Sequence, residues 1–149
     1  MTLQDARSEL EHPPRFPSAG LLALRAVVGL TFLVHGIDKP TDLSATERLF
    51  DGLDIPAPTL IAPVVAVTET VGGALLIAGL ATPLVAATLA INMLVALGTA
   101  HLEKSFSFFA KSGGIELELL LLGACATIAL AGAGRVSVDA EIATEGGTR

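Results

Sequence analysis

Four long apolar runs constrain this sequence more than any other feature. They cover residues 20–37, 59–80, 83–101 and 115–133, and few charged side chains interrupt them. An α-helix rises about 1.5 Å per residue, so about 20 residues cross a hydrocarbon core of about 30 Å. We therefore predict an all-α integral membrane protein, in which a bundle of four transmembrane helices occupies residues 19–135.

The overall composition agrees with this prediction. Hydrophobic residues make up 52% of the 149 residues, and charged residues only 16%. A soluble domain of this length has one small core, which could not shield four such helices from water. The runs also lack the alternation of apolar and polar residues that a transmembrane β-barrel requires, so helices are predicted rather than strands.

The polar segments define the chain ends and the connections. Residues 1–18 hold three prolines and no apolar periodicity, which predicts a flexible tail, and residues 136–149 form a C-terminal tail. Longer polar connections follow the first and third runs, at residues 38–58 and 101–114. An even number of crossings places both termini on one side of the membrane. Arg25, near the start of the first run, would extend toward that side, so we predict termini in the cytoplasm.

The charge and the cysteine content exclude several functional classes. The formal net charge of −6 is spread over short connections and leaves no basic surface for nucleic acid. Cys125 is the only cysteine, so one chain cannot form a disulfide, a CxxC redox pair or a c-type haem attachment. The sequence contains no cysteine set for an Fe–S cluster and no glycine motif for a dinucleotide. We therefore predict no covalent cofactor and no metal site.

Two charged residues, Arg25 and Glu69, fall inside the apolar runs beyond the first turn. An ionisable side chain near the bilayer centre costs at least about 2.5 kcal/mol on insertion scales. We therefore expect both side chains to face the bundle interior and to have partners, which makes them the first candidates for function. One alternative is an ion pair between Arg25 and Glu69 that only fixes the register of two helices.

A polar cluster is predicted at the membrane boundary beneath the two long connections. His35 and Lys39 end the first run, His101 ends the third and Glu116 begins the fourth, so all four lie on the same side. Glu69 lies about 14 Å below that boundary, by the rise of an α-helix. These residues, with Arg25, are the candidate ligand-binding and proton-handling groups.

The third and fourth runs refine this cluster. Glu116 is favoured as the inward carboxylate because Glu118, two residues later, points to nearly the opposite side of the helix. Glu116 shares its helical face with Leu120, Gly123 and Thr127. Asn92 lies on one stripe with Ala96 and Thr99, which we interpret as a source of hydrogen bonds between helices.

Several short segments of the chain together resemble the DoxX family over about residues 21–140. The segments that carry the resemblance are Leu24-Arg25, Gly29, Phe32-Leu33, His35-Gly36 with Lys39, Glu69, Gly72-Gly73, Gly79-Leu80-Ala81-Thr82-Pro83, Gly113-Gly114-Ile115-Glu116 and Gly132 to Ala140. The resemblance implies a small four-helix protein of the bacterial or archaeal cytoplasmic membrane. It also implies a link to respiratory quinone chemistry, as in the small subunits of quinol oxidase and thiosulfate:quinone oxidoreductase assemblies, or to oxidative stress. Glu118 and Ala133 depart from the family pattern.

Two functions are compatible with these features. The first is an accessory, quinone-linked oxidoreductase subunit, rather than a stand-alone enzyme, with electrons from a partner protein or a non-covalent cofactor. In this hypothesis Glu69 and Glu116 handle protons, and Arg25, His35, Lys39 and His101 bind the ligand. The second is a non-catalytic membrane scaffold that docks partner proteins through the two long connections. In both cases the lipid bilayer surrounds the chain, and a homo-oligomer is compatible with the small-residue faces.

Overall fold

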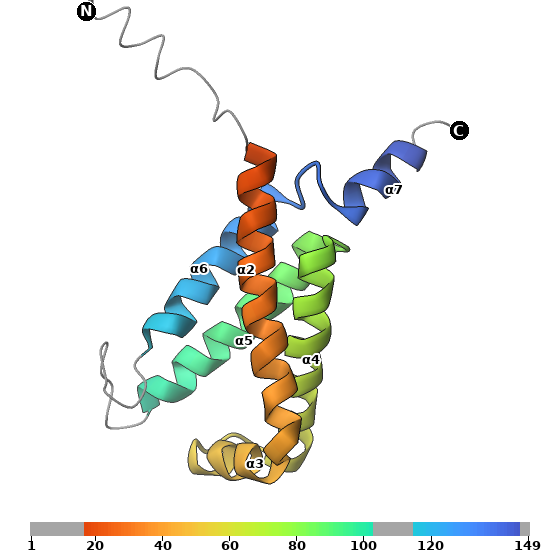
Figure 1. The fold of residues 1–149 in the computed structure, drawn as a ribbon. Coiled ribbons are helices and arrows are strands. Elements are labelled where there is room, and N and C mark those ends of the chain that lie inside the picture. The colour runs from red at the N-terminus through yellow and green to blue at the C-terminus, as the bar shows by residue number, and fades with distance from the viewer. Residues whose placement is uncertain (1–16, 103–114, 147–149) are drawn as a thin grey trace, which may run out of the picture.

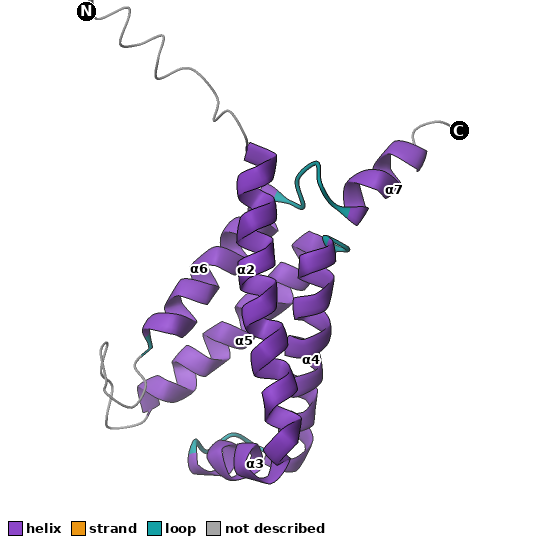
Figure 2. Cartoon of the chain, viewed as in Figure 1, coloured by secondary structure: helices purple, strands orange, loops and turns teal. Residues whose placement is uncertain are grey.

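This computed structural model describes residues 17–102 and 115–146, and over these residues the fold consists of helices joined by short loops (Figures 1 and 2). Six α-helices and one 3₁₀ turn follow one another there. In chain order they are α2 (Pro17–Asp38), η1 (Lys39–Asp42), α3 (Leu43–Gly52), α4 (Pro58–Ala78), α5 (Thr82–Leu102), α6 (Glu116–Ala131) and α7 (Val138–Gly146). The predicted all-α class is confirmed for these residues.

Three helices of the described part are long and apolar enough to cross a membrane. The spans are Ser18–Asp38 in α2, Pro58–Ala78 in α4 and Thr82–Thr99 in α5. α6 is apolar but has only 16 residues, because the chain leaves the helix at Gly132, whose φ is 80°. The fourth predicted crossing therefore stays a prediction.

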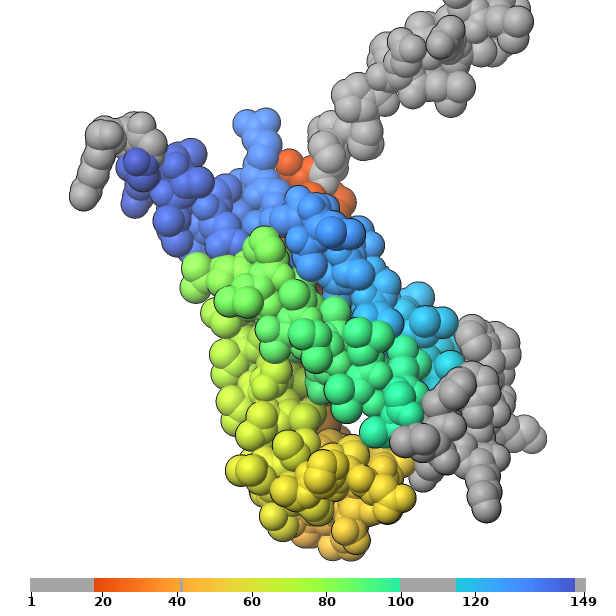
Figure 3. All heavy atoms as spheres, turned by 180° about the vertical axis from the view of Figure 1, so that it is seen from behind, coloured from red at the N-terminus to blue at the C-terminus, as the bar shows by residue number. Residues whose placement is uncertain are grey.

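The helices form two pairs that cross each other. α2 packs along α4, and α5 packs along α6 (Figure 1). In the space-filling view from behind, α5 covers the face between α4 and α6 (Figure 3). The buried core lies where the pairs meet and includes Phe32, Leu76, Leu89, Cys125 and Ile128. α3 lies at one end of the bundle, and the start of α2 lies with α7 at the other (Figure 1).

Two short helices lie outside the apolar runs. α3 forms within the first polar connection, where an interfacial helix is compatible with the sequence, and the Asp42 side chain caps it by accepting the Ala45 N–H at 2.9 Å. α7 forms within the C-terminal tail, where no helix was predicted. Both helices lie at the ends of the bundle rather than inside it.

Glycines allow the close approach of α2 and α4. A Cβ atom added at Gly73 would lie 2.6 Å from both Gly29 O and Leu33 N, and one added at Gly36 would overlap the Thr70 backbone. Helices in lipid associate largely through such close packing, since lipid tails are as apolar as the helices themselves. The glycines therefore hold together the helix pair that carries most of the candidate site.

Replacing Gly73 with alanine is expected to destabilise the bundle. The added methyl group must push α2 from α4, and overpacking of this kind costs about 1–3 kcal/mol or more. Gly98→Ala in α5 is the matched control, because a Cβ atom there meets nothing within 4 Å. Thermal unfolding in mild detergent, followed by circular dichroism, should show a lower midpoint for Gly73→Ala alone. Equal midpoints for the two variants would contradict this packing.

Candidate functional site

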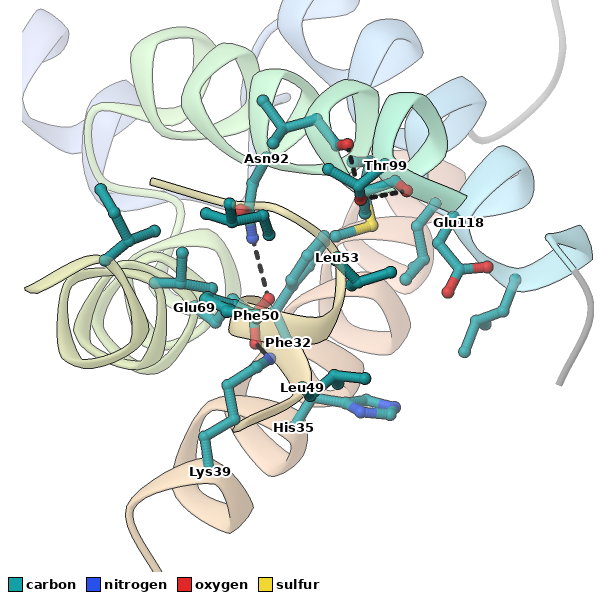
Figure 4. Close-up of a pocket in the computed structure, with 18 residues that line it drawn as sticks. Phe32, His35, Lys39, Leu49, Phe50, Leu53, Glu69, Asn92, Thr99 and Glu118 are labelled. Carbon is teal, nitrogen blue, oxygen red and sulfur yellow. Dashed lines mark hydrogen bonds and ion pairs between the residues drawn. The ribbon is translucent and has the colours of Figure 1, made fainter. Parts of the chain in front are cut away.

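A cavity of about 380 Å³ lies inside the bundle at the end that α3 covers (Figure 4). We call it the Glu69 cavity. Its apolar wall comes from α2, α4, α5, α6 and the α3 region, and includes Phe32, Phe50, Leu53, Met93 and Leu121. Its polar members are His35, Lys39, Glu69, Asn92, Thr99 and Glu118. Small-molecule sites are usually apolar pockets of this kind, into which a small number of polar groups point.

The Glu69 carboxylate is the centre of this cavity. The residue lies in the middle of α4 and is only 3% exposed. One carboxylate oxygen, Oε2, pairs with the Lys39 ammonium group, and the other, Oε1, accepts a hydrogen bond from Asn92 Nδ2 at 2.8 Å (Figure 4). A buried carboxylate requires such partners, because leaving it unpaired in an apolar medium is costly.

Lys39 reaches the carboxylate from the mouth of the cavity. It begins η1, directly after α2 ends at Asp38, and its side chain remains 23% exposed. The lysine side chain is long enough to place its ammonium group on a buried partner while its Cα atom stays near the membrane boundary. Three segments, η1, α4 and α5, thus meet at one ionised pair, and this pair connects the boundary to the bundle interior.

Some members of the predicted polar cluster lie together on the Glu69 cavity. The structure brings Lys39 and Glu69 together and places the exposed His35 on the cavity wall. His101 lies near the end of α5, but its side chain is outside the described part of the structure. Asn92, which was interpreted as structural, does make a hydrogen bond between helices. That bond is to the Glu69 carboxylate, so Asn92 belongs to the site.

The choice of Glu116 over Glu118 as the inward carboxylate is wrong for this cavity. Glu118 lines the Glu69 cavity, whereas Glu116 lines a separate groove between α2 and α6. Leu120, Gly123 and Thr127 line that same groove, so the predicted helical face exists but is turned toward α2. In each glutamate the Oε2 atom is buried and has no hydrogen-bond partner within the described residues.

The alternative ion pair between Arg25 and Glu69 is also wrong. Arg25 lies at the opposite end of the bundle, where it is 0% exposed and donates from Nη2 to the Val136 carbonyl at 2.7 Å. Its guanidinium lies against Gly79, where an added Cβ atom would collide with Nη1. Gly79 is ten residues from Glu69 along α4, about 15 Å by helix rise. Arg25 therefore does not belong to the Glu69 cavity.

Asp139 joins the C-terminal segment to the bundle beside Arg25. Its carboxylate accepts the backbone N–H of Ala81 at 2.7 Å and of Thr82 at 2.9 Å, at the start of α5. Burial alone would raise the pKa of this carboxyl. The two backbone hydrogen bonds and the Arg25 charge outweigh burial and hold the pKa below its ordinary value. α7 thus supplies the N-terminal cap of α5.

Replacing Asp139 with asparagine should lower stability near neutral pH by about 1 kcal/mol, the usual value of a helix cap. A carboxyl whose pKa is lowered by folding stabilises the fold above its ordinary pKa and loses that contribution as the pH falls through the lowered pKa. The deficit of the variant should therefore shrink in acid, below about pH 4. Thermal midpoints of both proteins across pH 3–8 test this. A deficit that is constant over the whole range would rule out the carboxylate as its source.

The chain is an α-helical membrane protein whose apolar bundle holds an ion-paired carboxylate in a cavity near one end of the helices.

Comparison with known proteins gives the family. Residues 20–102 match the DoxX family, and the chain belongs to that family. It is also 32% identical over 120 residues to "Putative oxidoreductase CatD" of Bacillus subtilis (strain 168), an alignment that covers 80% of this chain and 84% of the relative. No solved structure matches the chain significantly. The predicted family resemblance is thus confirmed.

Proposed function

We propose that the Glu69 cavity binds the head group of a quinone and that the chain is an accessory membrane subunit of an oxidoreductase. The observation that carries this proposal is the Lys39, Glu69 and Asn92 triad inside an otherwise apolar cavity. The name of the relative, an oxidoreductase, is consistent with it. Within this proposal the chain has a redox partner protein or a second copy as its neighbour in the bilayer.

The cavity suits a quinone ring in size and in chemistry. Its volume of about 380 Å³ is at the lower end of the range for ligand pockets, roughly 300–1,000 Å³. A quinone ring is flat and apolar and carries two carbonyl acceptors. Phe32, Phe50 and Met93 offer apolar contacts, while Lys39 and Asn92 carry N–H groups that Glu69 does not fully occupy.

The Glu69 carboxyl supplies the proton chemistry of the proposal. Reduction of a quinone to a quinol consumes two electrons and two protons, and the protons must reach the carbonyl oxygens. As a carboxylate paired with Lys39, Glu69 can take up a proton that enters from the boundary and pass it to a carbonyl oxygen of the reduced ring. Lys39 pairs with Glu69 and is itself partly exposed, and Glu118 lies on the cavity wall as a second carboxyl. The electrons come from a partner that carries a flavin or a haem.

We also propose four crossings, with both termini in the cytoplasm and the protein in the cytoplasmic membrane. α6 returns the chain to the end where α2 begins (Figure 1). A Cβ atom added at Gly134, just after α6, would lie 3.4 Å from Leu21 Cβ near the start of α2. The buried Arg25 lies at this same end, as expected for a positive residue on the cytoplasmic side.

The test of the proposed function is the quinone content of the purified protein. The full chain is purified in mild detergent from a host that makes quinones, and bound quinone is extracted and quantified per chain. An unrelated membrane protein of similar size, purified in the same way, gives the background. Quinone well above background is expected. A content equal to background would sink the proposal and favour a scaffold that docks partners through its connecting segments.

A further inference from the structure

The short helix α3 forms one wall of the Glu69 cavity at the end of the bundle (Figures 1 and 4). Leu49 and Phe50 of α3 and Leu53, which follows the helix, line the cavity. No residue of α3 is buried, and Leu49 is 58% exposed although it belongs to the cavity wall. Segments with few buried contacts open at a low cost in free energy. Packing therefore holds α3 in place less firmly than it holds the long helices.

The ion pair of Lys39 and Glu69 fastens the segment that carries α3. Lys39 begins η1, a 3₁₀ turn of four residues that leads directly into α3. Its ammonium group pairs with the Glu69 carboxylate in the middle of α4 (Figure 4). Arg48 of α3, by contrast, donates to Ser44 Oγ of the same helix. The pair thus joins the start of this segment to the inside of the bundle.

The connection from α3 back to α4 contains two residues with strained backbone. Asp54 has a φ of 54°, and Ala57, directly before α4, has a φ of 51°. Both values lie in the left-handed region that residues with a Cβ atom rarely adopt. Such conformations persist only where the surrounding structure holds them. The connection is therefore strained while α3 stays in place, and movement of α3 lets it relax.

The charge of Glu69 determines how strongly η1 is held. Within the described part of the chain, the polar groups that share the cavity with Glu69 include Lys39 of η1, His35 of α2, Asn92 of α5 and Glu118 of α6. Lys39 contacts the carboxylate directly, as an ion pair. A protonated carboxyl can still accept a hydrogen bond from an ammonium group, but it no longer attracts that group as a charge.

We propose that the pair of Lys39 and Glu69 is a latch that keeps α3 closed over the cavity, and that a proton taken up by Glu69 releases it. In this step the carboxylate gains one proton from water, Lys39 keeps its own protons, and a neutral hydrogen bond replaces the ion pair. α3 then swings about the connection at Asp54 and Ala57 and opens the cavity. The inference rests on the proposed function for the proton that Glu69 takes up, and it adds how access to the cavity is controlled.

The test measures the distance between α3 and α5 by double electron–electron resonance. Nitroxide labels are attached at Asp51→Cys in α3 and at Gly98→Cys in α5, two exposed positions. A Cβ atom at Gly98 meets nothing within 4 Å, so a label fits there. The chain also carries Cys125→Ala, which removes its only native cysteine. The full chain is studied in lipid nanodiscs without added quinone, so that the distances report on α3 alone.

The wild-type latch is expected to open in acid. A second, longer distance should appear as the pH falls from about 8 to about 4, the range in which histidine and carboxyl groups take up protons. Lys39→Met should populate this longer distance about tenfold more than wild type at neutral pH, because it removes one partner of a buried ion pair. Lys39→Arg keeps the charge and should stay closed. Arg48→Met, which removes a cation of α3 outside the cavity, is the matched control and should behave like wild type.

Glu69→Gln separates protonation of Glu69 from protonation of His35 or Glu118. Its neutral amide should give more of the longer distance than wild type at neutral pH, and no further change in acid. A pH response that survives in Glu69→Gln would overturn the inference. A single distance in wild type at every pH would do the same, as would equal distributions for Lys39→Met and Arg48→Met. If Lys39→Met does not fold, the wild-type and Glu69→Gln measurements decide. Failure of the proposed function appears instead in the quinone content, on which these distances do not depend.

Discussion

Replacing Glu69 with glutamine is expected to slow quinone reduction at least a hundredfold while leaving the bound quinone content almost unchanged. Glutamine keeps the shape of the side chain: its amide oxygen can accept from Lys39, and its NH₂ group can donate to Asn92 if that amide turns its oxygen toward it. It cannot carry a proton, and removal of a general acid typically costs about 10²–10⁴ in rate. The measurement is the rate of quinone reduction by membranes that contain the redox partner, normalised to folded protein and to quinone content.

The control for this prediction is a carboxylate far from the cavity. Glu141→Gln in α7 lies at the opposite end of the bundle and should leave the rate within about twofold. A rate for Glu69→Gln that also stays within about twofold of wild type would mean that Glu69 transfers no proton. Its pairing with Lys39 would then serve assembly alone, as a scaffold requires.

Replacing Arg25 with alanine is expected to cause the largest loss of folded protein. The guanidinium is fully buried and bonds to Val136 O, so truncation leaves a large void and an unpaired carbonyl between α2, α4 and the C-terminal segment. Large-to-small substitutions at fully buried sites cost about 2–5 kcal/mol. Fluorescence-detected size exclusion in mild detergent should show most of the variant aggregated or degraded.

Two further variants separate the causes of that loss. Arg48→Ala on the exposed surface of α3 removes a side chain whose Nη1 donates to Ser44 Oγ at 3.2 Å, and should accumulate like wild type. Arg25→Met keeps most of the volume but removes the hydrogen bond, and should be intermediate. Normal accumulation of Arg25→Ala would contradict a structural role for this residue.

Periodicity and hydropathy predicted the helices well, because a helix that crosses the lipid needs about 20 consecutive apolar residues. The observed bounds of α2, α4 and α5 lie within a few residues of the predicted runs. The end of α6 was predicted two residues too late, since Gly132 takes a positive φ that leaves the helix. α7 was missed because its nine residues carry little apolar signal, and its attachment through Asp139 depends on the distant start of α5.

For the candidate site, the sequence predicted how deep each side chain lies in the membrane, but not which side chains face the cavity. Lys39 and Glu69 meet because the end of one run lies above the middle of the next. Which carboxylate of α6 faces the cavity depends on the rotation of that helix about its axis. The rotation is set by packing against α5 and α2, which spacing along one helix cannot reveal, and so Glu118 rather than Glu116 lines the cavity.

Quinone binding in the Glu69 cavity is tested by the infrared spectrum of a bound quinone whose carbonyl carbons are isotope-labelled. If the ring lies in the Glu69 cavity, hydrogen bonds from Lys39 and Asn92 should shift a labelled carbonyl band to lower frequency than in lipid alone, and Lys39→Met should move it back. A band identical to that of the quinone in protein-free lipid, in wild type and variant alike, would contradict binding of the ring in this cavity.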